Sequence, residues 1–167
     1  MLRVINLSKV YDDGTVALRN VSFEVPDGQF LAVVGLSGSG KSTLLRCINR
    51  LIEPTDGEIW WNDIKLSHVT GEELRRARRK IGMIFQQFNL VERSSVLNNV
   101  LSGRLGYVNP VTSVLNRFSK ADMQRAYQSM DRVGIREKAN SRADELSGGQ
   151  QQRVGIARAL MQEPELV

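Results

Sequence analysis

The 167-residue sequence predicts an α/β fold built as one domain. Its first half holds short apolar runs typical of strands, and residues 30–34 (FLAVV) form a continuous run typical of a strand buried on both faces of a parallel sheet. A glycine-rich loop follows this run and leads into a helical pattern. Beyond residue 86 the pattern is mostly helical and returns towards strand at residues 165–167. This order predicts a sheet core with a helical subdomain.

The remaining elements of the first half follow from alternation and turn residues. Residues 42–51 predict a helix, with Cys47 as a packed core thiol. Trp60 and Trp61 are adjacent on a predicted strand, so they face opposite sides and at least one is partly exposed. Apolar runs separated by turn residues predict further strands at residues 2–7, 18–25, 58–61 and 81–85.

The second half holds two amphipathic patterns. Residues 109–110 (NP) break the helical pattern before the first of these two amphipathic segments. That first helix carries an apolar stripe with spacings of three and four, made of Met123, Ala126, Tyr127, Met130 and Val133. The second helix begins near Ser147, and its stripe is Val154, Ala157, Leu160 and Met161.

Composition restricts the partners. The net charge of +5 lies largely in residues 75–80 (RRARRK), which we interpret as a solvated helix face with Glu72 and Arg76 paired at helical spacing. No aromatic residues interleave with this run, so we expect no nucleic-acid partner. One cysteine allows no internal disulfide, and the single histidine, His68, is expected at the surface. No run approaches the roughly 20 apolar residues that span a bilayer, so a membrane role requires a partner chain.

The loop at residues 35–42 (GLSGSGKS) matches the pattern G-x-x-x-x-G-K-[ST] between a predicted buried strand and a helix. Glycines let backbone N–H groups approach phosphate oxygens, the helix start adds partial positive charge, and Lys41 neutralises the β and γ phosphates. The Ser42 hydroxyl suits Mg²⁺. A chance turn before a helix is the alternative, which the flanking elements disfavour. The predicted nucleotide-binding residues are Gly35, Leu36, Ser37, Gly38, Ser39, Gly40, Lys41, Ser42 and Thr43.

A second glycine-rich segment lies at residues 146–150 (LSGGQ). Ser147 and Gln150 have the spacing of a capping box, which alone predicts a helix N-cap. Gly148 and Gly149 are costly in a first turn unless something must approach the backbone closely. An exposed helix start is also a ready anion site.

These two segments, in this order, resemble the ATP-binding subunit of an ABC (ATP-binding cassette) transporter, and the resemblance runs along essentially the whole chain. It implies a P-loop NTPase with a RecA-like core, an antiparallel β subdomain and a helical subdomain, incomplete at the C-terminus. The implied parts are residues 1–86 (core with β subdomain), 87–146 (helical subdomain) and 147–167 (signature helix and the start of the next core strand).

The resemblance also implies ATP and Mg²⁺ as cofactors. Tyr11 would stack on adenine with Val16 nearby, although an exposed turn tyrosine is the alternative. Gln86, with Ser42, would touch Mg²⁺ and sense the γ-phosphate. Signature residues would face the γ-phosphate bound by a second copy, so that closing and opening of a head-to-tail homodimer is the power stroke. These residues in trans are Ser147, Gly148, Gly149 and Gln150.

Residues 102–107 (SGRLGY) and 154–160 (VGIARAL) look like the phosphonate-import branch of bacterial ABC importers. Importers of polar amino acids or methionine are the alternatives. The resemblance implies a peripheral subunit on the cytoplasmic face of the inner membrane, bound to permease subunits. A solute-binding protein would deliver the solute to these permease subunits. Other hypotheses are an inactive fragment and a non-transport ABC ATPase acting on DNA or ribosomes.

In the family, the strand that begins near residue 165 ends in a magnesium-binding Asp and a catalytic Glu, and a later His completes the site. None of these stands among the 167 residues, so no catalytic residue is assigned and we expect ATP binding with hydrolysis at background level. A missing central strand would also leave unpaired edges and an exposed apolar face, and we expect the isolated chain to be poorly soluble or loosely folded.

Overall fold

The computed structural model describes residues 1–108 and 118–167. The chain divides into two compact units, Met1–Leu74 and Arg75–Val167. The predicted interruption at residues 109–110 lies outside the described residues. Each unit has its own core and is described by itself.

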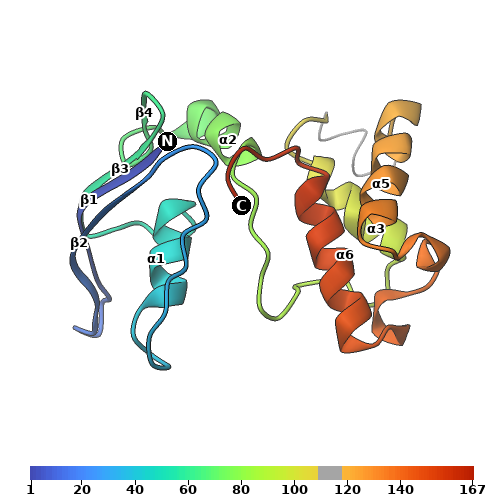
Figure 1. Ribbon diagram of the computed structural model, residues 1–167, viewed down its shortest axis with the longest axis horizontal. Coiled ribbons are helices and arrows are strands. Elements are labelled where there is room, and N and C mark those ends of the chain that lie inside the picture. The colour runs from blue at the N-terminus through green and yellow to red at the C-terminus, as the bar shows by residue number, and fades with distance from the viewer. Residues whose placement is uncertain (109–117) are drawn as a thin grey trace. The chain divides into compact units, whose positions relative to one another are not determined.

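The first unit is built on a four-stranded antiparallel sheet with the order β2-β1-β3-β4 (Figure 1). The predicted strands at residues 2–7, 18–25 and 58–61 are therefore confirmed, and so is the antiparallel sheet. The strands are β1 Leu2–Val10, β2 Val16–Val25, β3 Asp56–Trp61 and β4 Ile64–Lys65.

Bulges in this sheet explain why its apolar residues depart from strict alternation. Asn6 and Asn20 have left-handed backbone, with φ of 49° and 50°. The Asn6 amide donates a hydrogen bond to Ser22 Oγ at 2.7 Å, and the β1–β2 register shifts between Val4 and Leu7. Because a bulge inserts one residue, Val4 and Leu7 both point into the core although they are three positions apart.

Helix α1 Lys41–Ile48 is shorter than the predicted helix at residues 42–51. The chain turns after Ile48, where Arg50 adopts a left-handed φ of 53°. The helix buries Leu44, Cys47 and Ile48 in the first unit. Burial raises the pKa of the Cys47 thiol, which confirms a packed core thiol.

Two sequence predictions of strands are wrong. Residues 30–34 form no strand, and the side chains of Phe30 and Val34 are 93% and 88% exposed. Residues 81–85 contribute a single parallel bridge, between Ile81 and Leu166. Parallel strands are stabilised by hydrogen bonds from neighbouring strands. In residues 1–108 and 118–167 that bridge is the only parallel pairing, so these residues offer the apolar run at 30–34 no parallel sheet to enter.

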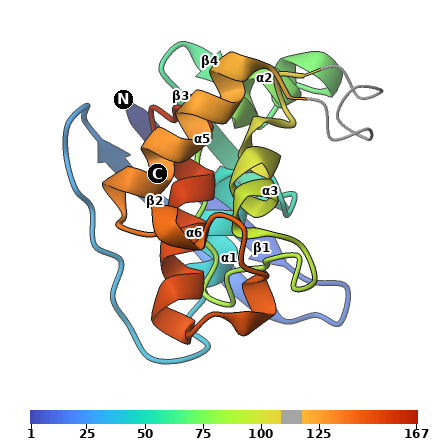
Figure 2. The same cartoon turned by 90° about the vertical axis from the view of Figure 1, so that its right-hand side faces the viewer.

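The second unit is helical (Figure 2). Its main helices are α3 Val96–Leu101, α5 Lys120–Arg132 and α6 Gly148–Leu160, joined by the short 3-10 helices η1 Ser102–Arg104, η2 Arg136–Lys138 and η3 Ala143–Glu145. The predicted apolar stripes of α5 and α6 pack together, which confirms both helices. The core consists of Val96, Val100, Leu101, Ala126, Met130, Ile135, Ala139, Leu146, Val154, Ala157 and Met161.

Helix α2 Gly71–Arg79 crosses the division between the two units and confirms that the basic run is helical. Trp61 is buried and Trp60 is half-buried, as their adjacency predicts. His68 is exposed, also as predicted.

Candidate nucleotide-binding loop and signature helix

The glycine-rich loop ends where α1 begins, and one glycine fixes this junction. Gly40 is the N-cap and has a left-handed φ of 86°. A Cβ on Gly40 would lie 2.3 Å from the carbonyl oxygen of Ala17, so any side chain would collide with backbone. The first turn of α1 has no side-chain cap and no acidic residue. Its N–H groups therefore present an uncompensated positive end.

Lys41 lies inside the curve of this loop. Its ammonium donates hydrogen bonds to the carbonyl oxygens of Gly35 at 2.8 Å and Leu36 at 2.6 Å, and contacts Ser39 Oγ at 3.3 Å. A compact cation at the uncapped start of α1, with no acidic residue in the first turn, fits a polyphosphate.

Ser42 is the residue of this loop that the sequence assigns to magnesium. Ser42 is exposed at the second position of α1. Among the described residues no group of three or more His, Cys, Asp or Glu side chains is arranged to hold a metal ion. A serine hydroxyl at the start of α1 fits Mg²⁺, which commonly takes phosphate and water oxygens for its other ligands.

Tyr11 stands beside the loop in the first unit. Its hydroxyl lies 3.2 Å from Thr43 Oγ1, on the first turn of α1, and the Lys9 ammonium lies 5.4 Å from its ring centroid. Val16 is exposed and pairs with Val10 where the two strands meet at the turn. The structure thus brings Tyr11 to the start of α1.

Gln86 occupies a tight turn in the second unit. The Phe88 amide donates to the Phe85 carbonyl at 3.0 Å, which places Gln86 at the exposed centre of a β-turn. Phe88 and Asn89 then adopt left-handed backbone, with φ of 55° and 46°. Two consecutive left-handed residues, one of them aromatic, are uncommon and need support from their surroundings.

The signature segment forms the predicted capping box. The backbone N–H of Gln150 donates to Ser147 Oγ at 3.4 Å, and the backbone N–H of Ser147 donates to Gln150 Oε1 at 3.0 Å. Gly148 and Gly149 are exposed, and a Cβ on either would meet nothing within 4 Å. Packing within the described chain therefore gives no reason for glycine at these two positions.

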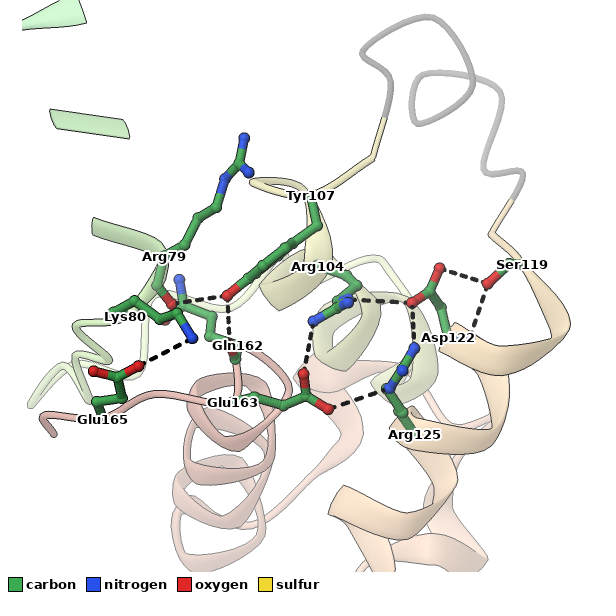
Figure 3. Close-up of polar contacts among 10 residues, drawn as sticks. All are labelled: Arg79, Lys80, Arg104, Tyr107, Ser119, Asp122, Arg125, Gln162, Glu163 and Glu165. Carbon is green, nitrogen blue, oxygen red and sulfur yellow. Dashed lines mark hydrogen bonds and ion pairs between the residues drawn. The ribbon is translucent and has the colours of Figure 1, made fainter. Parts of the chain in front are cut away.

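The far end of α6 is held by polar contacts that the sequence did not predict (Figure 3). The Tyr107 hydroxyl lies 2.9 Å from the Gln162 carbonyl oxygen and 3.2 Å from that of Arg79. A Cβ on Gly103 would lie 2.2 Å from the Arg158 carbonyl oxygen, so η1 lies directly against α6. These contacts show that residues 102–107 hold the end of α6. From the sequence, the same residues were identified only by their resemblance to a family.

Arg104 contacts the side chains of three residues near the end of α6: Asp122, Glu163 and Tyr107. Its guanidinium pairs with Asp122 at 3.1 Å and Glu163 at 3.3 Å, and its Cζ lies 4.0 Å from the Tyr107 ring centroid. Burial raises the pKa of Asp122, but hydrogen bonds from Ser119 and the charge of Arg104 outweigh it. The net effect holds the pKa of Asp122 below its ordinary value of 3.8.

Comparison with known proteins identifies the family. The sequence pattern of the family described as ABC transporter matches residues 18–167. The chain belongs to this family. Its P-loop NTPase fold is confirmed by the dimeric, ADP- and phosphate-bound structure of the ATP-binding cassette MJ0796, which superposes with a TM-score of 0.85 and 38% identity over 98% of this chain and 71% of that one.

Relatives within the ABC transporter family include proteins named as phosphonates import ATP-binding proteins. The phosphonates import ATP-binding protein PhnC 2 of Synechococcus sp. (strain JA-2-3B'a(2-13)) is 59% identical across all of this chain. The PhnC protein of Shouchella clausii (strain KSM-K16) is 56% identical across the same span. The chain covers 62% and 63% of these two relatives' own lengths. Among the described residues, no helix is long and apolar enough to cross a membrane.

Proposed function

We propose that this chain binds ATP through residues 35–42 and provides the energy-coupling ATPase subunit of a bacterial ABC importer. The observation that carries the proposal is the Lys41 ammonium inside the loop, at the uncapped positive start of α1. Ser42 and Gln86 would bind Mg²⁺, and Tyr11, with Val16 nearby, would stack on the adenine. Magnesium, when bound, neutralises charge that develops on the phosphates.

The signature residues act in trans in this proposal. Ser147, Gly148, Gly149 and Gln150 would contact the γ-phosphate bound by a second copy. Exposed glycines with open space around them support this role, because a ligand from outside the chain supplies the reason for having no side chain. The division into a core, a helical subdomain from residue 87 and a signature helix from residue 147 stays part of this proposal.

The proposed solute is a phosphonate or a related organophosphorus anion. The proposed partners are permease subunits, to which a solute-binding protein delivers the solute. The names of the relatives support this choice. The subunit would be peripheral on the cytoplasmic face of the inner membrane. For the 167 residues themselves we propose binding with only background hydrolysis, because none of them matches the family's hydrolytic Asp, Glu or His.

Titration with a fluorescent ATP analogue tests the binding site. We expect saturable binding by the 167-residue chain that Lys41→Ala weakens roughly 10- to 100-fold, since a hydrogen bond to a charged group contributes about 1.5–3 kcal/mol. Lys65→Ala is the matched control, because Lys65 pairs with Glu58 at the surface of the same unit. Equal affinities for the parent chain and Lys41→Ala would refute the site.

Growth and co-purification test the transport role. Disruption of the native gene should impair growth on a phosphonate as sole phosphorus source and leave growth on inorganic phosphate unchanged. The tagged protein, expressed from its own locus, should co-purify with a membrane permease. Co-purification with DNA or ribosomes instead, or a growth defect confined to methionine or polar amino acids, would contradict the assignment.

A further inference from the structure

Arg158 makes a bidentate contact with the turn that follows Gln86. From α6, its Nη1 donates to the Asn89 carbonyl oxygen at 2.7 Å and its Nη2 to the Phe88 carbonyl oxygen at 2.6 Å. Burial lowers the pKa of this guanidinium. Within the part of the chain that the structure describes, it contacts no carboxylate, so the backbone of the turn is its principal partner.

The two carbonyl groups belong to the two left-handed residues of the turn. Phe88 has φ of 55° and Asn89 has φ of 46°, a pair of conformations that persists only when neighbouring groups stabilise it. A guanidinium presents parallel donors in a rigid plane, so it fixes the orientation of two successive peptide groups at once. Arg158 is therefore placed to stabilise the backbone that carries Gln86.

The same residue stands on the signature helix. Arg158 follows Gly148 by ten positions in α6, which corresponds to about 15 Å along a rigid helix. Helical geometry sets this distance, and between the two positions Val154 and Ala157 pack α6 into the core of the second unit. A movement at the start of α6 thus reaches the turn through a hydrogen-bonded contact.

We infer that Arg158 is a positioning residue that ties the turn carrying Gln86 to the signature helix, so that the responses of the two segments to the γ-phosphate are coupled. This inference rests on the proposed function, because it assigns the γ-phosphate to Gln86 and to the start of α6. Arg158 itself touches no nucleotide in this scheme.

Arg158→Met tests the coupling, because it keeps the length of the side chain and removes the donors. We would measure affinities for ADP and for a non-hydrolysable ATP analogue, together with amide hydrogen exchange at residues 86–90, on the full 167-residue chain. The parent chain should prefer the ATP analogue and show slower exchange at 86–90 when it is bound. In Arg158→Met the preference should fall by about fivefold or more, and the slowing of exchange should be lost.

Two further variants make the result specific. Asn89→Gly retains the carbonyl oxygen and the left-handed backbone, so it should behave like the parent chain. Arg158→Lys retains the charge without the planar fork and should lose part of the preference. If Arg158→Met does not fold, Arg158→Lys serves as the test of the coupling.

The outcomes separate the inference from the function on which it rests. Full preference and full slowing of exchange in folded Arg158→Met, or in Arg158→Lys when the Met variant is unfolded, would overturn the inference alone. A parent chain that binds neither nucleotide would overturn the proposed function instead.

Discussion

The two glycine-rich segments differ in what requires their glycines. At residues 35–42, Gly40 has a left-handed φ of 86°, and its missing Cβ leaves room for the Ala17 carbonyl group. At residues 146–150, Gly148 and Gly149 lie in ordinary helix with open space around them. The fold itself requires the first glycine, whereas packing within the described chain gives no reason for glycine at the second pair.

The two segments also differ in how they are held. The loop is shaped by backbone geometry and by Lys41, whose contacts lie within six residues along the chain. The signature helix is packed into a core and held at its far end by side chains from distant segments (Figure 3). Substitutions in the loop should therefore act locally and sharply, and those around α6 should act through long-range contacts.

Gly40→Ala should have the largest effect on folding. It combines a strained backbone with a collision against the Ala17 carbonyl, and we expect a loss of about 2–4 kcal/mol in the free energy of unfolding, measured with urea. Nucleotide binding should be lost as well. Gly38→Ala is the matched control, because Gly38 has φ of 81° with nothing within 4 Å. It should cost only about 1–2 kcal/mol, and equal losses would show that the Ala17 contact is unimportant.

Asp122→Asn should have the next largest effect and a defined pH dependence. It weakens the part-buried contacts with Arg104 and Ser119, and we expect a loss of about 2–3 kcal/mol at pH 7. Because the folded state lowers the pKa of Asp122, this carboxylate stabilises the fold above its ordinary value of 3.8 and loses that contribution as the pH falls through the lower, folded value.

The difference between the parent chain and Asp122→Asn should therefore shrink below about pH 4. Asp131→Asn is the control, because Asp131 pairs with Arg136 at the surface and should contribute less than about 1 kcal/mol. A difference that stays constant from pH 7 to pH 3 would contradict the role of the ionised carboxylate.

Tyr107→Phe should cost about 1 kcal/mol, because it removes the hydrogen bond that ties residues 102–107 to the end of α6. Thermal unfolding of this variant can be compared with that of Tyr127→Phe. Among the described residues the Tyr127 hydroxyl makes no hydrogen bond, while its ring lies 5.0 Å from Arg136 Cζ. Equal melting temperatures of the two variants would show that the Tyr107 hydroxyl does not stabilise α6.

Gly149→Ala should have the smallest effect on folding and the opposite sign. Alanine in a helix is more favourable than glycine by about 0.5–1 kcal/mol, and the added Cβ meets nothing within 4 Å. The same variant should weaken ATP-dependent dimerisation, measured by sedimentation. Gly155→Ala lies in the same helix, also with open space, and should stabilise the fold without affecting the dimer. Unchanged dimerisation in Gly149→Ala would remove the support for a site in trans.

Local patterns predicted the short-range structure around the two glycine-rich segments, and long-range pairing limited the rest. The helix that begins after residues 35–40, the capping box of Ser147 and Gln150 and the stripe of α6 depend on residues a few positions apart, and the structure contains all three. The predicted strand at residues 30–34 is wrong because a parallel strand depends on neighbours that its own composition cannot show.

The contacts of Arg158 and Tyr107 were equally hidden from the sequence. Arg158 reaches carbonyl groups 69 and 70 positions away, and Tyr107 reaches one 55 positions away. Backbone carbonyl groups occur at every residue, so no pattern of side chains identifies them as partners. The one local signal for the Arg158 contact is an arginine ten positions after a glycine-rich helix start.

Amide hydrogen exchange at the two glycine-rich segments, measured with MgATP over a range of protein concentrations, distinguishes ATP binding within one chain from contact with ATP in trans. If the loop binds ATP within the chain and the signature contacts it in trans, residues 37–43 should be protected at every concentration. Residues 147–150 should be protected only where the chain dimerises. Protection of both segments at the lowest concentration, or protection of residues 147–150 alone, would show that the signature does not act on ATP bound by a second copy.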